Sequence, residues 1–70
     1  MSVEEYDTHV IQIGNVYLVA VAYDDTKVCR LSENIYDGIR IPEEEVARKL
    51  ARMVSGKAVK FNPVTGRKVV

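Results

Sequence analysis

The side chains best suited to chemistry in this sequence are one cysteine and one histidine. Cys29 could serve as a nucleophile, but nucleophilic catalysis needs a neighbouring base, and His9 is expected near the far end of the first predicted hairpin. A zinc site takes about four ligands, so one Cys and one His cannot form one. We therefore predict that Cys29 is a small buried residue and that His9 lies at the rim of the core with a local hydrogen bond.

The neighbouring carboxylates are explained by local backbone structure. Asp24 and Asp25 stand in "DDTK", between two predicted strands, where Asp favours a turn. The run from Glu43 to Glu45 begins a predicted helix, where acidic side chains favour the positive end of the helix dipole. The sequence contains no glycine-rich phosphate loop and no Cys-x-x-Cys pair, and a lone "SGK" is too short for a P-loop. We therefore predict no enzymatic activity, no metal site, no cofactor and no small-molecule substrate.

The charged residues are divided unevenly along the chain. The net charge is zero, but residues 1–45 contain all ten acidic residues, whereas residues 46–70 contain seven basic residues and no acidic one. Such asymmetry is typical of a surface for nucleic acid or another acidic partner, although the two segments could instead face each other in the fold. A nucleic-acid-binding domain would use the predicted basic helix and C-terminal hairpin, through Arg48, Lys49, Arg52, Lys57, Lys60, Arg67 and Lys68.

Two β-rich runs predict a hairpin at the start of the domain. Gly14 and Asn15 separate "THVIQI" from "VYLVAVAY" and suit a two-residue turn, which indicates strands at residues 8–13 and 16–23. The turn "DDTK" leads to a third strand at residues 28–32, "VCRLS". These three strands form an antiparallel meander, preceded by a flexible tail at residues 1–7.

The segment from Pro42 to Gly56 predicts an amphipathic helix. Pro42 suits the first turn, acidic residues precede basic ones, and Gly56 ends the helix. Strands at residues 57–61 and 67–70, joined by "NPVTG", then form a hairpin. The expected fold is α+β, in the order β-β-β-α-β-β, with the helix on one sheet face. The expected apolar stripe of the helix is Val46, Leu50, Met53 and Val54.

The two-residue turn also predicts which side chains share a face of the sheet. Gln12 would lie opposite Tyr17, and the pairing would continue along both strands as far as His9 opposite Ala20. If "DDTK" forms the next loop, Ala20 lies opposite Leu31. We expect the helix to pack on the aliphatic face, made of Ile11, Ile13, Val16, Leu18, Ala20 and Ala22, together with Val59 and Phe61.

The other face of the sheet mixes valines with tyrosines and an arginine. A helix of about 14 residues is about 21 Å long and covers one side of the sheet only. An apolar patch with tyrosines and an arginine has the composition of an interface centre. We predict self-association, as a homodimer, through Val10, Gln12, Tyr17, Val19, Val21, Tyr23, Val28 and Arg30. A different protein partner, or cover by the C-terminal strand and the N-terminal tail, are the alternatives.

The length of the chain bounds its class. Seventy residues make one domain, expected over residues 8–70, near the lower size limit for a core without disulfides, metal or a partner subunit. The sequence lacks the pattern of a signal peptide and any apolar stretch of about 18 residues. We therefore expect a cytoplasmic, non-catalytic interaction module, and the alternative is a nucleic-acid-binding domain.

Two segments, "GNVYLVAVAYDDTKVCRLSEN" and "VARKLARMVSGKAVKFNP", resemble the small N-terminal domain of the O6-alkylguanine-DNA alkyltransferase family. That domain similarly has a "G-x-Y/L" strand, a strand close to "V-x-R-L-S" and a helix ending near "L-x-x-x-x-x-G-K-x-V-x-F". The resemblance covers residues 13–63. It implies a ribonuclease-H-like sheet, in which the strand after the helix lies parallel to and beside the first strand.

The resemblance carries neither activity of these families to this chain. Alkyl transfer takes place in a second domain with a Pro-Cys-His-Arg motif and a DNA-binding helix-turn-helix, and "VCRL" around Cys29 is not that motif. Ribonuclease-H-like nucleases use carboxylates on the first and fourth strands. Neither "THVIQI" nor "KAVKF" contains a carboxylate.

Overall fold

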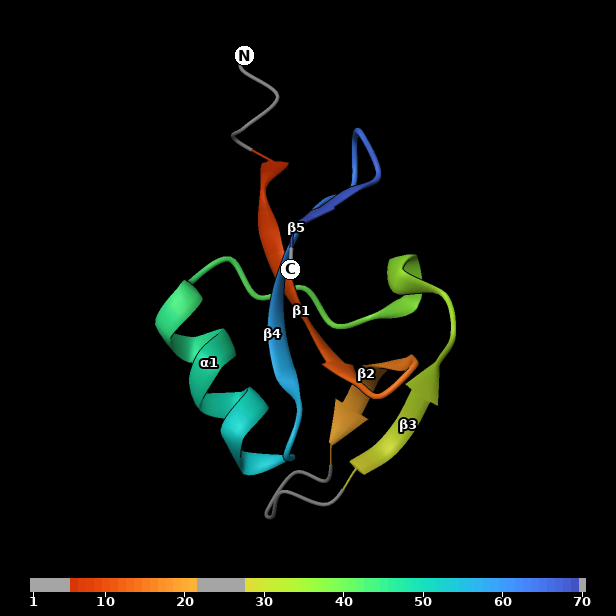
Figure 1. The fold of residues 1–70 in the computed structure, drawn as a ribbon, viewed down its shortest axis with the longest axis vertical. Coiled ribbons are helices and arrows are strands. Elements are labelled where there is room, and N and C mark those ends of the chain that lie inside the picture. The colour runs from red at the N-terminus through yellow and green to blue at the C-terminus, as the bar shows by residue number, and fades with distance from the viewer. Residues whose placement is uncertain (1–5, 22–27, 70) are drawn as a thin grey trace.

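The strands and the helix follow the predicted order along the chain. A computed structural model describes residues 6–21 and 28–69. Within these residues the α+β class is confirmed, as five strands and one α-helix with a short 3₁₀ helix before it (Figure 1). The elements are β1 (Thr8–Ile13), β2 (Val16–Val21), β3 (Val28–Ser32), η2 (Ile35–Asp37), α1 (Glu44–Met53), β4 (Lys57–Asn62) and β5 (Arg67–Val69).

All five strands belong to one sheet, in the order β3-β2-β1-β4-β5, and every neighbouring pair is antiparallel. The parallel pairing that the resemblance implies between the first strand and the strand after the helix is therefore wrong. Ile41, just before α1, pairs with His9 near the start of β1, and Gly56, just after α1, lies close to Gln12 near the end of β1. Because the helix runs along β1 and a tight turn follows it, β4 must return in the opposite direction, with Val10 opposite Val59.

The first hairpin has fewer residue pairs than the two-residue turn led us to predict. Strands β1 and β2 pair only at Gln12 with Tyr17 and at Ile13 with Val16. Beyond these pairs the connection from η2 to α1, residues 38–43, takes the place of β2, and we call it the crossover segment. Its Ile41 exchanges two backbone hydrogen bonds of 2.9 Å with His9. The expected pairing of His9 with Ala20 is wrong, because the crossover segment occupies that edge of β1.

The pairing of β2 with β3 is also shifted from the predicted register. Ala20 lies opposite Arg30 rather than Leu31, and Leu31 lies opposite Leu18. The register is irregular on both sides of Ala20, which is typical of a β-bulge. The turn predicted at "DDTK" and the last two residues of the predicted second strand lie outside the described residues.

Helix α1 packs on one face of the sheet with alanines rather than with the expected stripe. Ala47 and Ala51 are buried, whereas Val46 and Met53 are 52% and 49% exposed. The prediction that Val46 and Met53 belong to the stripe that packs on the sheet is therefore wrong. The small alanine side chains let the helix approach the sheet closely. Ile11, Leu18 and Ile41 complete this core, with Ile13, Leu50, Val54 and Ala58 packed against it.

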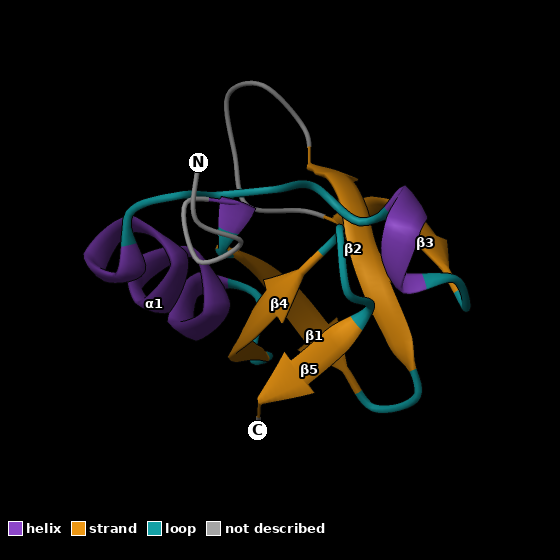
Figure 2. Cartoon of the chain, turned by 90° about the horizontal axis from the view of Figure 1, so that it is seen from above, coloured by secondary structure: helices purple, strands orange, loops and turns teal. Residues whose placement is uncertain are grey.

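A second cluster covers the opposite face of the sheet. It consists of Val10, Tyr17, Val59 and Phe61, with Ile35 of η2 packed against them. Val59 and Phe61 were expected on the helix face, and this is wrong because their pairing with β1 places them on the side of Val10. Tyr36 of η2 adds an edge-to-face contact with the Phe61 ring at 5.2 Å between centroids. Figure 2 shows α1 and η2 on opposite sides of the strands.

Asp7, which was expected in the flexible tail, is attached to the end of β4. Its Oδ1 accepts a hydrogen bond of 2.7 Å from Asn62 Nδ2. The Asn62 side-chain oxygen in turn accepts from the backbone N–H groups of Val64 and Thr65 and so holds the turn into β5. This network fixes Asp7 beside β4, where it becomes part of the site described below.

Candidate nucleic-acid interface

The burial of Ala47 and Ala51 decides where the basic residues of α1 lie. Each residue of a helix is rotated by about 100° from the one before it. Arg48 and Arg52 follow the two buried alanines, so they lie at the flank of the helix, one turn apart, and both are exposed. This flank borders β4, whose first residue is Lys57.

Between this flank and β4 lies a hollow of about 700 Å³, which we call the basic hollow. It brings together four of the seven residues predicted to bind nucleic acid. Its lining residues are Glu45, Arg48, Lys49, Ala51, Arg52, Gly56, Lys57 and Ala58. Four cations against one carboxylate make this the clearest concentration of positive charge among the described hollows.

Among the described residues, most cations of the basic hollow have no acidic partner. Arg48 Nη2 donates to Glu44 Oε1 at 2.8 Å, and both side chains are more than half exposed. Lys49, Arg52 and Lys57 form no ion pair with any residue that the structure describes. Their charges are therefore available to an anion from solution.

A second hollow of about 570 Å³ adjoins the first and is called the His9 hollow here. Arg48 and Ala58 line both hollows, so the two lie next to each other on either side of these residues, between α1 and the β4–β5 hairpin. The His9 hollow is lined by Asp7, His9, Pro42, Glu44, Arg48, Ala58, Lys60 and Val69. Lys60, another predicted nucleic-acid residue, lies 3.5 Å from Asp7 Oδ2.

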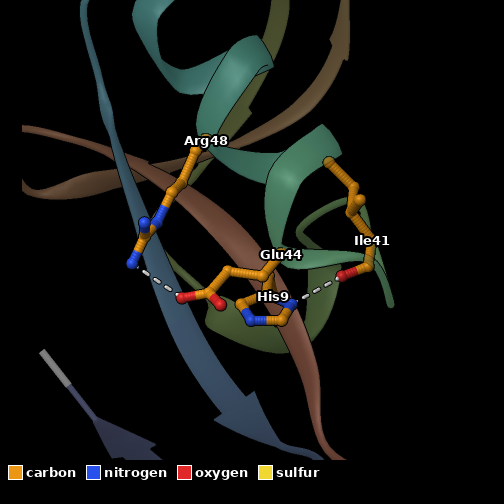
Figure 3. Close-up of polar contacts among 4 residues, drawn as sticks. All are labelled: His9, Ile41, Glu44 and Arg48. Atoms are coloured by element: carbon orange, nitrogen blue, oxygen red, sulfur yellow. Dashed lines mark hydrogen bonds and ion pairs between the residues drawn. The ribbon is translucent and has the colours of Figure 1, made fainter.

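The His9 ring is fixed by the crossover segment. Its Nδ1 lies 3.0 Å from the Ile41 carbonyl oxygen (Figure 3). A carbonyl oxygen only accepts, so Nδ1 carries a hydrogen and donates it. The predicted hydrogen bond is present, but Ile41 is distant in sequence, so the prediction that it is local is wrong.

The last two predicted nucleic-acid residues are separated by the alternation of β5. Lys68 lies opposite Phe61 and faces the second core, where its Nζ donates to Tyr17 Oη at 3.1 Å and stands 5.6 Å from the centre of that ring. Lys68 is therefore not part of the groove. Arg67 is exposed and alternates with Lys68, so it shares the sheet face of Lys60.

The predicted interface on the other sheet face is partly covered by the chain itself. Val10 is completely buried and Tyr17 is 9% exposed, so their assignment to an interface is wrong. Ile35 of η2 covers them, and this short 3₁₀ helix was not predicted. Gln12 and Val19 are partly buried, and Arg30 is exposed. The side chains of Val21, Tyr23 and Val28 lie outside those that the structure describes.

Several of the residues that could carry chemistry are not described by the structure. Asp24 and Asp25, and the side chain of Cys29, lie outside the described part of the chain. Glu43 caps the start of α1 without a side-chain hydrogen bond. Within residues 6–21 and 28–69, no group of three or more His, Cys, Asp or Glu side chains could hold a metal ion.

No protein-family model, curated protein or solved structure matches this chain. The resemblance to the alkyltransferase N-terminal domain therefore stays a prediction from short motifs. In the described residues, no helix is long and apolar enough to cross a membrane.

Proposed function

We propose that this domain binds nucleic acid through the phosphate backbone, in the groove that the basic hollow forms between α1 and β4. The observation that carries the proposal is the gathering of Arg48, Lys49, Arg52 and Lys57 around one hollow, with three of these cations lacking an acidic partner among the described residues. Phosphate contacts supply most of the affinity of sequence-independent binding. A net charge of zero is compatible with this, because the field near a groove depends on the charges that line it.

The positions of the acidic residues also favour the groove as the binding site. Glu33 directly follows β3, and Asp37 of η2 accepts a hydrogen bond from Ser32 of β3, so both acids lie near the β3 edge of the sheet, away from the hollow between α1 and β4. Among the described acids, Glu45 lines the basic hollow, and Glu44 and Asp7 line the His9 hollow, where each holds a cation in an ion pair. The described residues that line the basic hollow therefore carry an excess of positive charge.

The test is a titration of a labelled single strand of about 12 nucleotides, DNA or RNA, followed by fluorescence anisotropy. We expect the double variant R52E/K57E to lower the affinity by at least about tenfold. The slope of log K against log salt, between about 50 mM and about 200 mM, should become shallower by about 0.7 for each phosphate that the variant no longer neutralises.

The matched control is R40E/K68E, which reverses two exposed cations outside the groove and changes the net charge equally. We expect this control to retain most of the affinity. Equal losses of affinity in the two double variants would mean that only the overall charge matters, and the groove would then not be the binding site.

We also propose self-association, favoured by one observation at the opposite edge of the molecule. Strand β3 is one of the two edge strands of the described sheet, and its Leu31 is 44% exposed beside Val19 and Arg30 of the predicted interface. An edge strand presents unpaired backbone groups that can pair with a second copy. This location leaves the basic groove open.

A further inference from the structure

The His9 hollow contains a proton-binding group with a fixed orientation. Nδ1 donates to the Ile41 carbonyl, and Figure 3 shows the other ring nitrogen, Nε2, on the side of the ring turned away from Ile41. In the neutral ring Nε2 therefore offers only a lone pair, which repels an anion. In the protonated ring Nε2 becomes a donor with a positive charge, and histidine is the side chain suited to make this change near neutral pH.

Among the described residues, the other charges around His9 balance one another. Asp7 precedes β1, Glu44 and Arg48 extend from α1, and Lys60 extends from β4. Arg48 is paired with Glu44, and Lys60 is paired with Asp7. Val69 is the described residue that β5 contributes to this hollow, and its side chain has no charge. Because the two described cations and two described anions cancel, protonation of His9 makes the sum of the described charges positive.

We propose that the His9 hollow binds a phosphate group of the nucleic acid held in the basic hollow, and that protonated His9 donates a hydrogen bond to it through Nε2. The inference rests on the proposed function: Arg48 and Ala58 line both hollows, so a strand held in the basic hollow would pass the His9 hollow next to it. Binding should therefore be tighter when His9 is protonated.

His9 is the only histidine in the chain, so its ring protons can be followed by NMR without ambiguity. The first experiment titrates the intact protein from about pH 8 to about pH 5.5, with and without a saturating single strand of about 12 nucleotides. We expect the strand to move the His9 midpoint upward by about one pH unit, which corresponds to about tenfold tighter binding to the protonated protein. An unchanged or lowered midpoint would overturn the proposal.

Inorganic phosphate, at the same total phosphate concentration, is the second probe. We expect a clearly smaller shift of the midpoint, because the free ion lacks the contacts of the neighbouring hollow. An equal shift would show that the hollow binds phosphate ions as such, and the assignment to nucleic acid would be wrong.

The variant H9N removes Nε2 and keeps an amide N–H that can reach the Ile41 carbonyl. Its affinity for the strand should be nearly independent of pH over the range in which wild-type binding tightens about tenfold. If the affinities of wild type and H9N for the strand rise equally at low pH, His9 is not the group that makes binding depend on pH.

Failure of this inference differs from failure of the proposed function. If wild-type protein binds no strand at any pH at low salt, the proposed function itself fails. If binding depends on Arg52 and Lys57 but the His9 midpoint does not move, the nucleic acid occupies the basic hollow and not the His9 hollow. The NMR titration uses the unmodified chain, so the test does not depend on a variant that folds.

Discussion

Ser55 and Gly56 connect α1 to β4, and each of the two positions favours glycine for a different reason. Ser55 has a φ of 58°, in the left-handed region, and Gly56 N–H donates to the Ala51 carbonyl at 2.7 Å. These are features of a Schellman motif, in which the left-handed position is usually glycine. Gly56 itself does not have a positive φ. Its role is close approach, since an added Cβ would lie 2.9 Å from the Gln12 carbonyl oxygen.

We predict that two single substitutions here have opposite effects on the free energy of unfolding. G56A should lower it by about 1–3 kcal/mol, because backbone atoms of β1 must move to admit the methyl group. S55G should raise it by about 0.5–1 kcal/mol, because glycine adopts a positive φ without steric cost. Urea denaturation measures both. If G56A were as stable as wild type, the contact with Gln12 would not be a constraint.

At the scale of elements, the rotation of α1 about its axis determines both the core and the groove. The helix buries Ala47 and Ala51 and leaves Val46 and Met53 exposed. Had the predicted stripe faced the sheet, Arg48 and Arg52 would have been turned differently relative to β4. The position of the basic hollow therefore follows from the two alanines.

We predict that leucine substitutions at adjacent helix positions differ sharply in effect. A47L inserts a large side chain where Ala47 is completely buried against the sheet, which should cost about 1–3 kcal/mol of unfolding free energy. V46L changes a residue that is 52% exposed and should cost less than about 0.5 kcal/mol. Equal costs in urea denaturation would mean that the helix faces the sheet differently.

The elements themselves were largely predictable from the sequence. Gly14 has a positive φ at the first turn, as expected, and the bounds of β1 and β3 match the prediction. The groove was predictable only as a set of basic residues, because nothing local in the sequence specifies the direction of β4. That direction depends on the crossover segment around Ile41, whose pairing with His9 is a contact between distant parts of the chain.

At the scale of the molecule, α1 packs on one face of the sheet and η2 covers part of the other face, within the residues that the structure describes. Alternation alone predicted an open second face, because the sequence did not reveal that Ile35 would cover Tyr17. The proposed contact between copies therefore shifts from the face of the sheet to its β3 edge.

We predict that Leu31 controls self-association. Sedimentation equilibrium of wild type, over about a hundredfold range of concentration, should show a mass rising from 7.9 kDa toward about twice that value. L31K should keep the monomer mass, because a charge at an edge strand opposes pairing. The control V64K changes an apolar residue that is 59% exposed in the turn before β5 and should behave as wild type. A monomer at all wild-type concentrations would contradict the prediction.

The central position of β1 has a consequence for the order in which the domain folds. β1 shares only two residue pairs with β2, whereas five of its residues pair with β4, far along the chain. Closing such a long loop costs entropy before its contacts form, and folding slows as contacts become less local. The first three strands would therefore lack a stable core until residues 57–62 have paired with β1. Folding of this domain should be a single concerted event that depends on β4.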